Sequence, residues 1–172
     1  NKMIGKDHSD TVVGTTMSNQ GVVEALGKRG VSFLRTDVGD KYISRELVKH
    51  NLNIGAEPSG HVIQREFSES GDSNIALIQT LAALQELDTS IAEIKKNIDY
   101  KPLSLKNFSV SDIEVVESEI FIESINKLKK NHPEARISVR KSGTEPIIRA
   151  MVEAETEKDK DFILGEIESL IS

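Results

Sequence analysis

The segment Arg140 to Arg149, RKSGTEPIIR, carries the residue types that bind a phosphate group. Ser142 and Thr144 offer hydroxyl donors, and Gly143 allows the backbone to approach a ligand closely and to adopt a positive φ. Successive amides in such a turn form an anion-binding nest, and the two flanking arginines can bind phosphate oxygens in a bidentate manner. On chemistry alone, a phosphomonoester site and a polar β-turn with solvated arginines are equally supported.

A second polar segment, Gly55 to His61 (GAEPSGH), follows a predicted strand. Ligands of open α/β sheets bind at the carboxyl ends of strands. Glu57 can accept hydrogen bonds from two neighbouring sugar hydroxyls, and Ser59 can donate or accept beside it. Gly60 keeps side-chain bulk away from a ligand, and His61 can exchange a proton or donate a hydrogen bond. From the residues alone, a proline-glycine turn with a surface histidine is the simpler interpretation.

The elements that position the GAEPSGH segment are predicted to form a mostly parallel sheet with helices on its faces. The order of strand, helix, strand, helix, strand over the first half of the chain is typical of this arrangement. A strongly apolar helix then opens after Asp72, and we expect it to be buried on several sides. The expected strands cover residues 11–15, 31–35 and 51–55, and the expected helices begin after Asn19 and at Asp40.

The second half of the chain predicts a separate small domain. Residues 100–107 (YKPLSLKN) contain a proline and no helical period, so we expect a linker there and place the domain boundary near Asp99. This division gives a partial α/β/α parallel-sheet domain over residues 1–98 and a small α+β domain over residues 99–172. The predicted order in the second domain is strand, helix, strand, strand, helix.

Apolar spacing predicts the helices and strands of this second domain. A helix with Ile120, Ile125 and Leu128 on its apolar face should end near Pro133. Two strands should cover residues 135–140 and 147–153. A final helix capped by Thr156 should turn Phe162, Ile163, Ile167, Leu170 and Ile171 inward. The RKSGTEPIIR segment therefore lies between the ends of two predicted strands.

Composition narrows the function classes. The 172-residue chain has a net charge of −6 and 4% aromatic residues, which argues against nucleic acid as a partner. It has no cysteine, which excludes disulfides and zinc–thiolate sites and fits a cytoplasmic protein. No apolar run reaches the length of a membrane span, so no membrane partner is expected. The chain starts with Asn1 instead of Met, so we expect a fragment. We expect no metal site at the isolated histidines His8, His50 and His132, because no second ligand stands at a suitable spacing in the sequence.

The whole RKSGTEPIIRAMVEAE stretch resembles the phosphate-binding loop of the last domain of the α-D-phosphohexomutases, R-x-S-G-T-E-P-x-x-R. The AMVE that follows the loop is similar to the phosphoglucosamine mutase version. GAEPSGH resembles the G-E-x-S-G-H sugar-recognition loop of the family's third domain, with Ala56 and Pro58 departing from the usual residues. TVVGTTMSNQG, RTDVGDKYI and GDSNIALIQTL resemble further segments, so the resemblance runs from Thr11 to Ile171.

The resemblance implies a role for particular residues in binding a phosphosugar. Lys41 stands where arginine is usual in the V-G-D-R-Y-V segment of the family and would neutralise a phosphate as a point charge. The implied sugar-binding residues are Glu57, Ser59, Gly60, His61 and Lys41. The implied phosphate-binding residues are Arg140, Ser142, Gly143, Thr144 and Arg149.

The resemblance also implies an enzyme, an isomerase that moves a phosphoryl group between O6 and O1 of a hexosamine phosphate through a bisphosphorylated sugar. The family's phosphoserine loop, T-A-S-H-N-P, and its Mg²⁺ loop, D-G-D-x-D-R, do not occur in the chain. The catalytic serine and the Mg²⁺ ligands are therefore expected upstream, in N-terminal domains that would be partners of this segment, which alone should be inactive. Phosphomannomutase or phosphoglucomutase activity, and a non-catalytic phosphosugar-binding remnant of a split gene, remain alternatives. The sequence predicts no oligomeric state.

Overall fold

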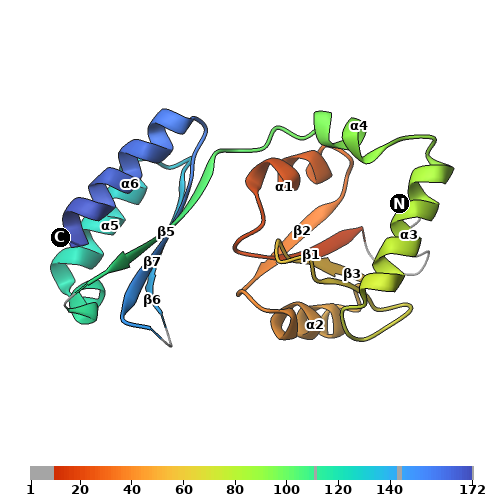
Figure 1. Ribbon diagram of the computed structural model, residues 1–172, viewed down its shortest axis with the longest axis horizontal. Coiled ribbons are helices and arrows are strands. Elements are labelled where there is room, and N and C mark those ends of the chain that lie inside the picture. Colours follow the sequence, from red (N-terminus) through yellow and green to blue (C-terminus); the bar gives the residue numbers. More distant parts are fainter. Residues whose placement is uncertain (1–9, 111, 143–144, 172) are drawn as a thin grey trace. The chain divides into compact units, whose positions relative to one another are not determined.

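The structure is a computed structural model that describes residues 10–110, 112–142 and 145–171 (Figure 1). The chain divides between Tyr100 and Lys101 into two compact units, and each is described by itself. Within the described residues, no helix is long and apolar enough to cross a membrane.

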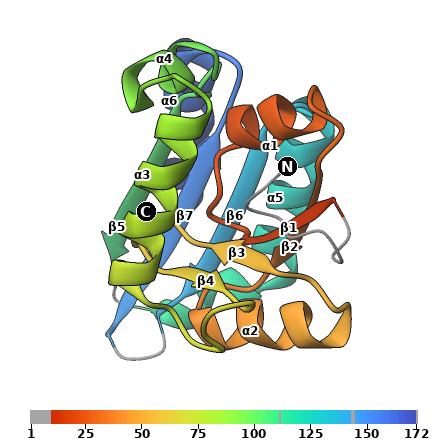
Figure 2. The same ribbon diagram turned by 90° about the vertical axis from the view of Figure 1, so that its right-hand side faces the viewer.

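The first unit contains a four-stranded sheet with strand order β2-β1-β3-β4. Strand β1 pairs in parallel with β2 and β3, as expected, whereas β3 and β4 form an antiparallel hairpin. Strand β4 was not predicted, because its three residues are too few to show alternation. Helices α1 and α2 lie on opposite sides of the sheet (Figure 2). The elements are β1 (Thr11–Thr15), α1 (Gln20–Gly27), β2 (Ser32–Thr36), α2 (Asp40–Lys49), β3 (Ile54–Ala56), β4 (Val62–Gln64), α3 (Ser73–Glu86) and α4 (Ile91–Lys96).

The core of the first unit lies between the sheet and α2. Ile43 and Leu47, four residues apart on one face of α2, are almost fully buried. They pack with Val13 of β1 and Ile63 of β4, which are also buried. Helix α2 carries Asp40 in its first turn and Lys49 in its last, the arrangement that the helix dipole favours. The apolar face of α2 thus sets the position of β3, the strand that leads into the GAEPSGH segment.

Helix α3 corrects one expectation. Its apolar composition predicted burial on several sides, but none of its residues is buried. Leu77, Ile78 and Leu81 are 58%, 63% and 56% exposed. The helix forms because Asp72 caps it, accepting hydrogen bonds from the amides of Asn74 and Ile75. Apolar composition shows that a helix can be buried, but it does not show that any described segment covers it. The shorter α4 begins with a capping box of Ser90 and Glu93.

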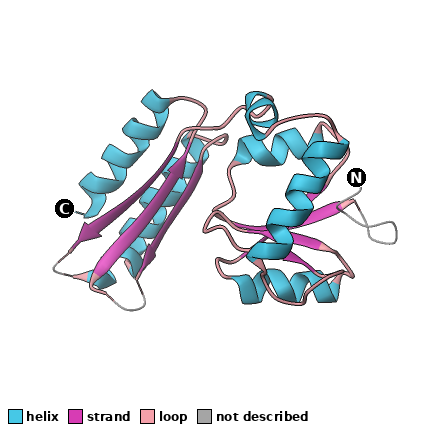
Figure 3. Ribbon diagram, turned by 45° about the vertical axis from the view of Figure 1, so that its right-hand side comes forward, coloured by secondary structure: helices cyan, strands magenta, loops and turns pink. Residues whose placement is uncertain are grey.

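The second unit contains a three-stranded antiparallel sheet with strand order β5-β7-β6. Both long helices cover one face of this sheet (Figure 3). Strand β5 corrects the predicted linker: residues 103–109 pair with β7 at every position, so only the start of the YKPLSLKN stretch is unpaired. The elements are β5 (Leu103–Ser109), the 3-10 helix η2 (Ile113–Glu117), α5 (Glu119–Asn131), β6 (Arg136–Lys141), β7 (Ile147–Glu153) and α6 (Glu157–Ile171).

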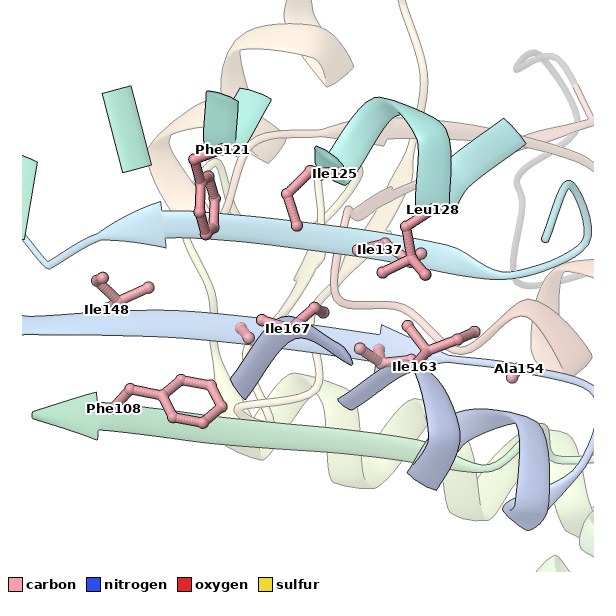
Figure 4. Close-up of a cluster of buried hydrophobic side chains, with 11 residues drawn as sticks. Phe108, Phe121, Ile125, Leu128, Ile137, Ile148, Ala154, Ile163 and Ile167 are labelled. Carbon is pink, nitrogen blue, oxygen red and sulfur yellow. The ribbon is translucent and has the colours of Figure 1, made fainter. Parts of the chain in front are cut away.

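The core of the second unit lies between this sheet and its two helices (Figure 4). Helix α5 begins after the Ser118 cap and buries Phe121, Ile125 and Leu128, which are spaced along one face. Ile120, expected on that face, is 78% exposed, and Phe162 of α6 is also exposed. Ile120 is next to the buried Phe121, and Phe162 is next to the buried Ile163. Apolar composition alone does not show which of two neighbouring apolar residues is buried. The buried side chains of the cluster are Phe108, Phe121, Ile125, Leu128, Ile137, Ile148, Ala150, Val152, Ala154, Ile163 and Ile167.

The other face of the second sheet contains one buried charge. Glu153 of β7 is only 2% exposed, and it forms an ion pair with Arg136, its directly opposed residue on β6. Breaking a buried pair leaves one charge desolvated without a partner, which is costly. Lys106 and Glu168 form a comparable pair in the same unit, 2.8 Å apart but exposed to solvent. Pairs of this exposed kind contribute little to stability.

Exchanging Ile43 for alanine should destabilise the first unit, because the missing side chain leaves a cavity against the sheet. We expect Ile43→Ala to lower the free energy of unfolding by about 2–5 kcal/mol. Leu77→Ala is the matched control, since it removes a similar side chain from an exposed helix face and should cost less than about 0.5 kcal/mol. Urea unfolding followed by NMR signals of the first unit measures both. Equal losses would contradict the assignment of the core.

Removing the partner of Glu153 should destabilise the second unit. We expect Arg136→Ala to lower the free energy of unfolding by about 3 kcal/mol, and Lys106→Ala to lower it by less than about 1 kcal/mol. Chemical denaturation of the two variants, followed by NMR signals of the second unit, provides the comparison. A small loss of unfolding free energy in both variants would show that the ion pair between Arg136 and Glu153 contributes little to stability.

Candidate functional site

The GAEPSGH segment forms the turn of the β3–β4 hairpin. The amide of Gly60 donates to the carbonyl of Glu57 at 3.0 Å, closing a four-residue turn, and the amide of Glu57 donates to the carbonyl of His61. Pro58 occupies the second position of this turn, where its fixed φ is favourable. Gly60 has a φ of 98°, which glycine adopts without strain. Proline at position 58, which departs from the residue expected there, is thus compatible with the local backbone.

Three of the predicted side chains meet in this turn. The hydroxyl of Ser59 donates to Oε1 of Glu57 at 2.7 Å, and Nδ1 of His61 lies 3.2 Å from the same oxygen. The side chain of Glu57 is 9% exposed, whereas that of His61 is 60% exposed. Gly55, on β3 just before the turn, lets the strand approach α2 closely, since a Cβ there would lie 2.2 Å from Cγ2 of Ile43.

The hydrogen-bond donors around Glu57 hold its carboxyl group in the ionised form. The pKa of Glu57 lies below its ordinary value of 4.5, chiefly because of the Ser59 hydroxyl, with a further contribution from His61 and from the backbone amide of Gly39. Burial acts in the opposite direction on this pKa but is outweighed. An ionised carboxylate with one oxygen engaged can still accept hydrogen bonds from ligand hydroxyls.

Lys41 lies two residues after Gly39, whose backbone amide contacts Glu57, but it does not join the three side chains. Gly39, whose amide binds Glu57, immediately precedes α2, and Lys41 is the second residue of that helix. The ammonium of Lys41 lies over the ring of Tyr42, 4.8 Å from its centroid, in a cation–π contact. The structure therefore brings together Glu57, Ser59 and His61, with Lys41 on a neighbouring segment.

The two predicted arginines of the second unit occupy directly opposed positions. Arg140 of β6 pairs in register with Arg149 of β7. Directly opposed residues of antiparallel strands project to the same face. Ile148 and Ala150, on either side of Arg149, face the helices, so both arginines project from the face that α5 and α6 leave uncovered. Two guanidinium groups in adjacent positions repel each other unless an anion lies between or beside them.

Glu145 is a residue of this site that the sequence reasoning did not single out. Its carboxylate accepts a hydrogen bond from Nη2 of Arg149 at 2.9 Å. Four-residue spacing predicts an ion pair on a helix, whereas these two residues lie in a turn and on β7, so their spacing along the chain does not predict this contact. Arg149 Nε is buried, and no described residue offers it a hydrogen-bond partner. Glu145 therefore holds one nitrogen of the guanidinium and leaves other donors for a ligand.

The turn between β6 and β7 completes this site only in part. The amide of Ser142 donates to the carbonyl of Ile147 at 2.9 Å, which closes the hairpin next to the two arginines. Gly143 and Thr144, the other predicted members of the turn, lie outside the described residues. Ser142 and the arginine pair are therefore the predicted phosphate-binding residues whose place the structure gives.

Lys141 differs from its neighbour Arg140 because strand alternation turns it to the other face. Its ammonium lies 2.6 Å from Glu117 and 2.9 Å from Glu114 of η2. Glu117, and then Glu114, raise the pKa of Lys141, and the hydrogen bond from Lys141 lowers the pKa of Glu117. Lys141 thus fastens the end of β6 to η2, and its charge is already neutralised.

Two arginines of the first unit are structural. The guanidinium of Arg35 donates to the carbonyls of Thr15 and Ser18, and that of Arg65 donates to the carbonyls of Leu47 and Leu52. No group of three histidine, aspartate or glutamate side chains that could hold a metal ion occurs in the described part of the chain. The described residues therefore do not fit a resident Mg²⁺.

The fold and these two sites define a class of protein: an α/β unit with a polar hairpin turn, followed by a small α+β unit with an arginine pair on its open face. Two family profiles match the chain, the phosphoglucomutase/phosphomannomutase α/β/α domain III over residues 1–100 and the C-terminal domain of the same family over residues 81–168. The chain belongs to the phosphoglucomutase/phosphomannomutase family, the α-D-phosphohexomutases.

Relatives within this family are phosphoglucosamine mutases. The chain is 35% identical to the phosphoglucosamine mutase of Thermosipho africanus, over 99% of this chain and 39% of that protein. It is 36% identical to the enzyme of Parvibaculum lavamentivorans, with 99% and 38% covered. The chain therefore spans about two fifths of the length of these relatives.

Solved structures share the fold. The product complex of an N-acetylglucosamine-phosphate mutase superposes with a TM-score of 0.80 at 19% identity, over 99% of this chain and 41% of that one. The Aspergillus fumigatus N-acetylphosphoglucosamine mutase in complex with GlcNAc-6P and magnesium gives a TM-score of 0.73 at 14% identity, over 94% and 38%. These likenesses support the fold class predicted from the sequence.

Removing the hydroxyl of Ser59 should raise the pKa of Glu57 toward 4.5, since that hydroxyl is the main cause of the lowered value. The folded pKa is below the ordinary one, so the stability that Glu57 contributes is present above pH 4.5 and is lost as the pH falls through the folded pKa. We expect Ser59→Ala to reduce this contribution. An NMR titration of the Glu57 carboxyl carbon measures the shift, with Ser68→Ala as the control. An unchanged pKa in Ser59→Ala would contradict the assigned cause.

Proposed function

We propose that this chain is the C-terminal, substrate-holding part of a phosphosugar mutase that interconverts a hexosamine 6-phosphate and the corresponding 1-phosphate. The observation that carries the proposal is the opposed arginine pair, Arg140 and Arg149, on the uncovered face of the second sheet. Relatives that share 34–36% identity over nearly the whole chain are named phosphoglucosamine mutases, which supports the choice of sugar.

The second unit would hold the phosphate that is not being transferred. The guanidinium group of Arg140 makes no hydrogen bond or ion pair with any described residue, and that of Arg149 uses one nitrogen for Glu145. Both retain donors in the fork geometry that suits phosphate oxygens. Charge-assisted hydrogen bonds contribute about 1.5–3 kcal/mol each, so these two side chains would dominate the affinity. Ser142, Gly143 and Thr144 would add hydroxyl and amide donors from the turn.

The first unit would hold the sugar ring. Glu57 is kept ionised by Ser59, so it can accept hydrogen bonds from two adjacent sugar hydroxyls. Ser59 and the exposed His61 flank it, and Gly60 adds no bulk on the ligand side. A carboxylate that binds a pair of neighbouring hydroxyls accepts a sugar in either of two orientations, which a mutase that acts on both ends requires. Lys41 would supply a further positive charge near the ligand.

The bond-making residues would lie in the part of the enzyme that precedes this chain, which is also its proposed partner. A sugar hydroxyl oxygen attacks the phosphorus of a phosphoserine, the bond to the serine oxygen breaks, and a bisphosphorylated sugar forms as the hydroxyl loses its proton. The sugar then returns its other phosphoryl group to the serine. Mg²⁺, bound outside this chain, would stabilise the phosphoryl charge. The residues described here would position the ligand, and positioning is a large share of phosphoryl-transfer catalysis.

Pro58 favours a second candidate substrate. A proline at this position of the sugar turn has no amide donor, so a contact that a backbone amide could make with an amino-sugar substituent is absent. A phosphomannomutase or phosphoglucomutase would not need that contact. The family profiles, which are named for phosphoglucomutase and phosphomannomutase, are compatible with this candidate.

Calorimetric titration of the chain with glucosamine 6-phosphate tests the proposal. We expect binding that requires the phosphate, so glucosamine alone should bind at least tenfold more weakly. Arg149→Ala should weaken glucosamine 6-phosphate binding at least tenfold, because one charge-assisted bond contributes more than 1.4 kcal/mol. Arg29→Ala, which removes the same charge from the end of α1, is the matched control and should bind like the parent chain. Mannose 6-phosphate in parallel compares the two candidate substrates.

Equal binding of glucosamine and glucosamine 6-phosphate by a folded chain would overturn the phosphate site. Turnover is tested by supplying the remaining N-terminal part of a phosphoglucosamine mutase in trans. Interconversion of the two phosphates would support the mutase. Phosphate-dependent binding without turnover under these conditions would point to a binding module instead.

A further inference from the structure

Asn107 of β5 lies in line with the arginine pair. In the register of the second sheet, Asn107 is directly opposed to Arg149, which is in turn directly opposed to Arg140. Phe108, the next residue of β5, faces the helices, so Asn107 projects to the uncovered face with both arginines. Directly opposed residues have Cβ atoms about 5 Å apart. Asn107, Arg149 and Arg140 thus form one polar row across all three strands, called here the polar row.

The polar row differs from the next row along the sheet. The neighbouring row consists of Leu105, Met151 and Ser138, and the first two are apolar. Asparagine is depleted in strands, because it packs poorly on a pleated surface. An exposed asparagine in the middle of a paired strand therefore has no evident structural role here. Neither its carboxamide nor the Arg140 guanidinium makes a hydrogen bond with any described residue.

The chemistry of a carboxamide fits this position. Its oxygen can accept from the buried Nε of Arg149, which lacks a partner among the described residues. Its nitrogen can at the same time donate to a phosphate oxygen. A carboxylate could do the first but not the second, and it would repel the phosphate. An apolar side chain could do neither.

We propose that Asn107 is a third phosphate-binding side chain, which in the phosphate-bound chain orients Arg149 through its oxygen and binds the phosphate through its nitrogen. The inference rests on the proposed phosphate site of the second unit. It extends that site beyond the RKSGTEPIIR segment to the opposite edge of the sheet, onto a strand more than thirty residues earlier in the chain. It assigns to β5 a role in ligand binding in addition to its role in the sheet.

The test is an NMR titration of the full chain with inorganic phosphate and with glucosamine 6-phosphate, following amide and arginine Nε–H signals. We expect Asn107→Ala to weaken both ligands about tenfold, as the loss of a hydrogen bond to a charged group does. Asn107→Asp should weaken them further, because it places a negative charge beside Arg149. Asn131→Asp, which makes the same change at the end of α5, should alter affinity less than twofold. The Arg149 Nε–H signal of the phosphate-bound chain should also shift in Asn107→Ala, because the proposed contact from the carboxamide oxygen forms when phosphate is bound.

The outcomes separate this inference from the proposed function. If Arg149→Ala loses binding while Asn107→Ala and Asn107→Asp bind like the parent chain, Asn107 is not a ligand and the phosphate site remains. If the folded parent chain binds neither phosphate nor glucosamine 6-phosphate, both proposals are wrong. Should Asn107→Asp fail to fold, Asn107→Ser provides the comparison, since it retains a short donor and should lose less affinity than Asn107→Ala.

Discussion

The pairing of β7 with β5 on one side and β6 on the other determines the rest of the second unit. Because side chains alternate along a strand, Ile148 and Ala150 reach the helices while Arg149 and Met151 reach the opposite face. The apolar contacts that stabilise the core therefore also hold Arg149 in register with Arg140. A one-residue shift in the pairing of β7 would turn the core side chains away from the helices and turn Arg149 toward them. The face that carries the arginine pair is thus ordered by the same strand that the core requires.

The elements that the sequence predicted well are those with a strong local signal. Strands β1 and β7 lie at the residues where they were predicted, 11–15 and 147–153. The elements that were missed depend on long-range partners. Strand β4 has only three residues. The second domain was expected to begin with a strand, but the first residues of that strand, β5, were predicted as a linker because their partner β7 lies far along the chain. The exposure of α3 could not be predicted, since composition does not say what covers a helix.

The candidate site shows the same division. Glu57, Ser59 and His61 lie within five residues of one turn, so their contact follows from local sequence. The arginines were recognised only as the two ends of a segment, because their opposition depends on the register between β6 and β7. Asn107 lies on β5, more than thirty residues before the arginines, and sequence separation hides a neighbour on an adjacent strand. The contact of Glu145 with Arg149 depends on the turn before β7, which spacing along the chain does not predict.

The arrangement of the polar row on antiparallel strands fixes its dimensions. The separation of Arg140 and Arg149 is set by backbone hydrogen bonds, which hold neighbouring strands about 4.8 Å apart whatever residues they carry. Substitutions at these two positions therefore change the side-chain chemistry while the spacing of the two backbones is kept. An anion bound by this pair, as proposed, would meet two guanidinium groups whose backbone positions the strands fix and whose flexible side chains adjust to its size.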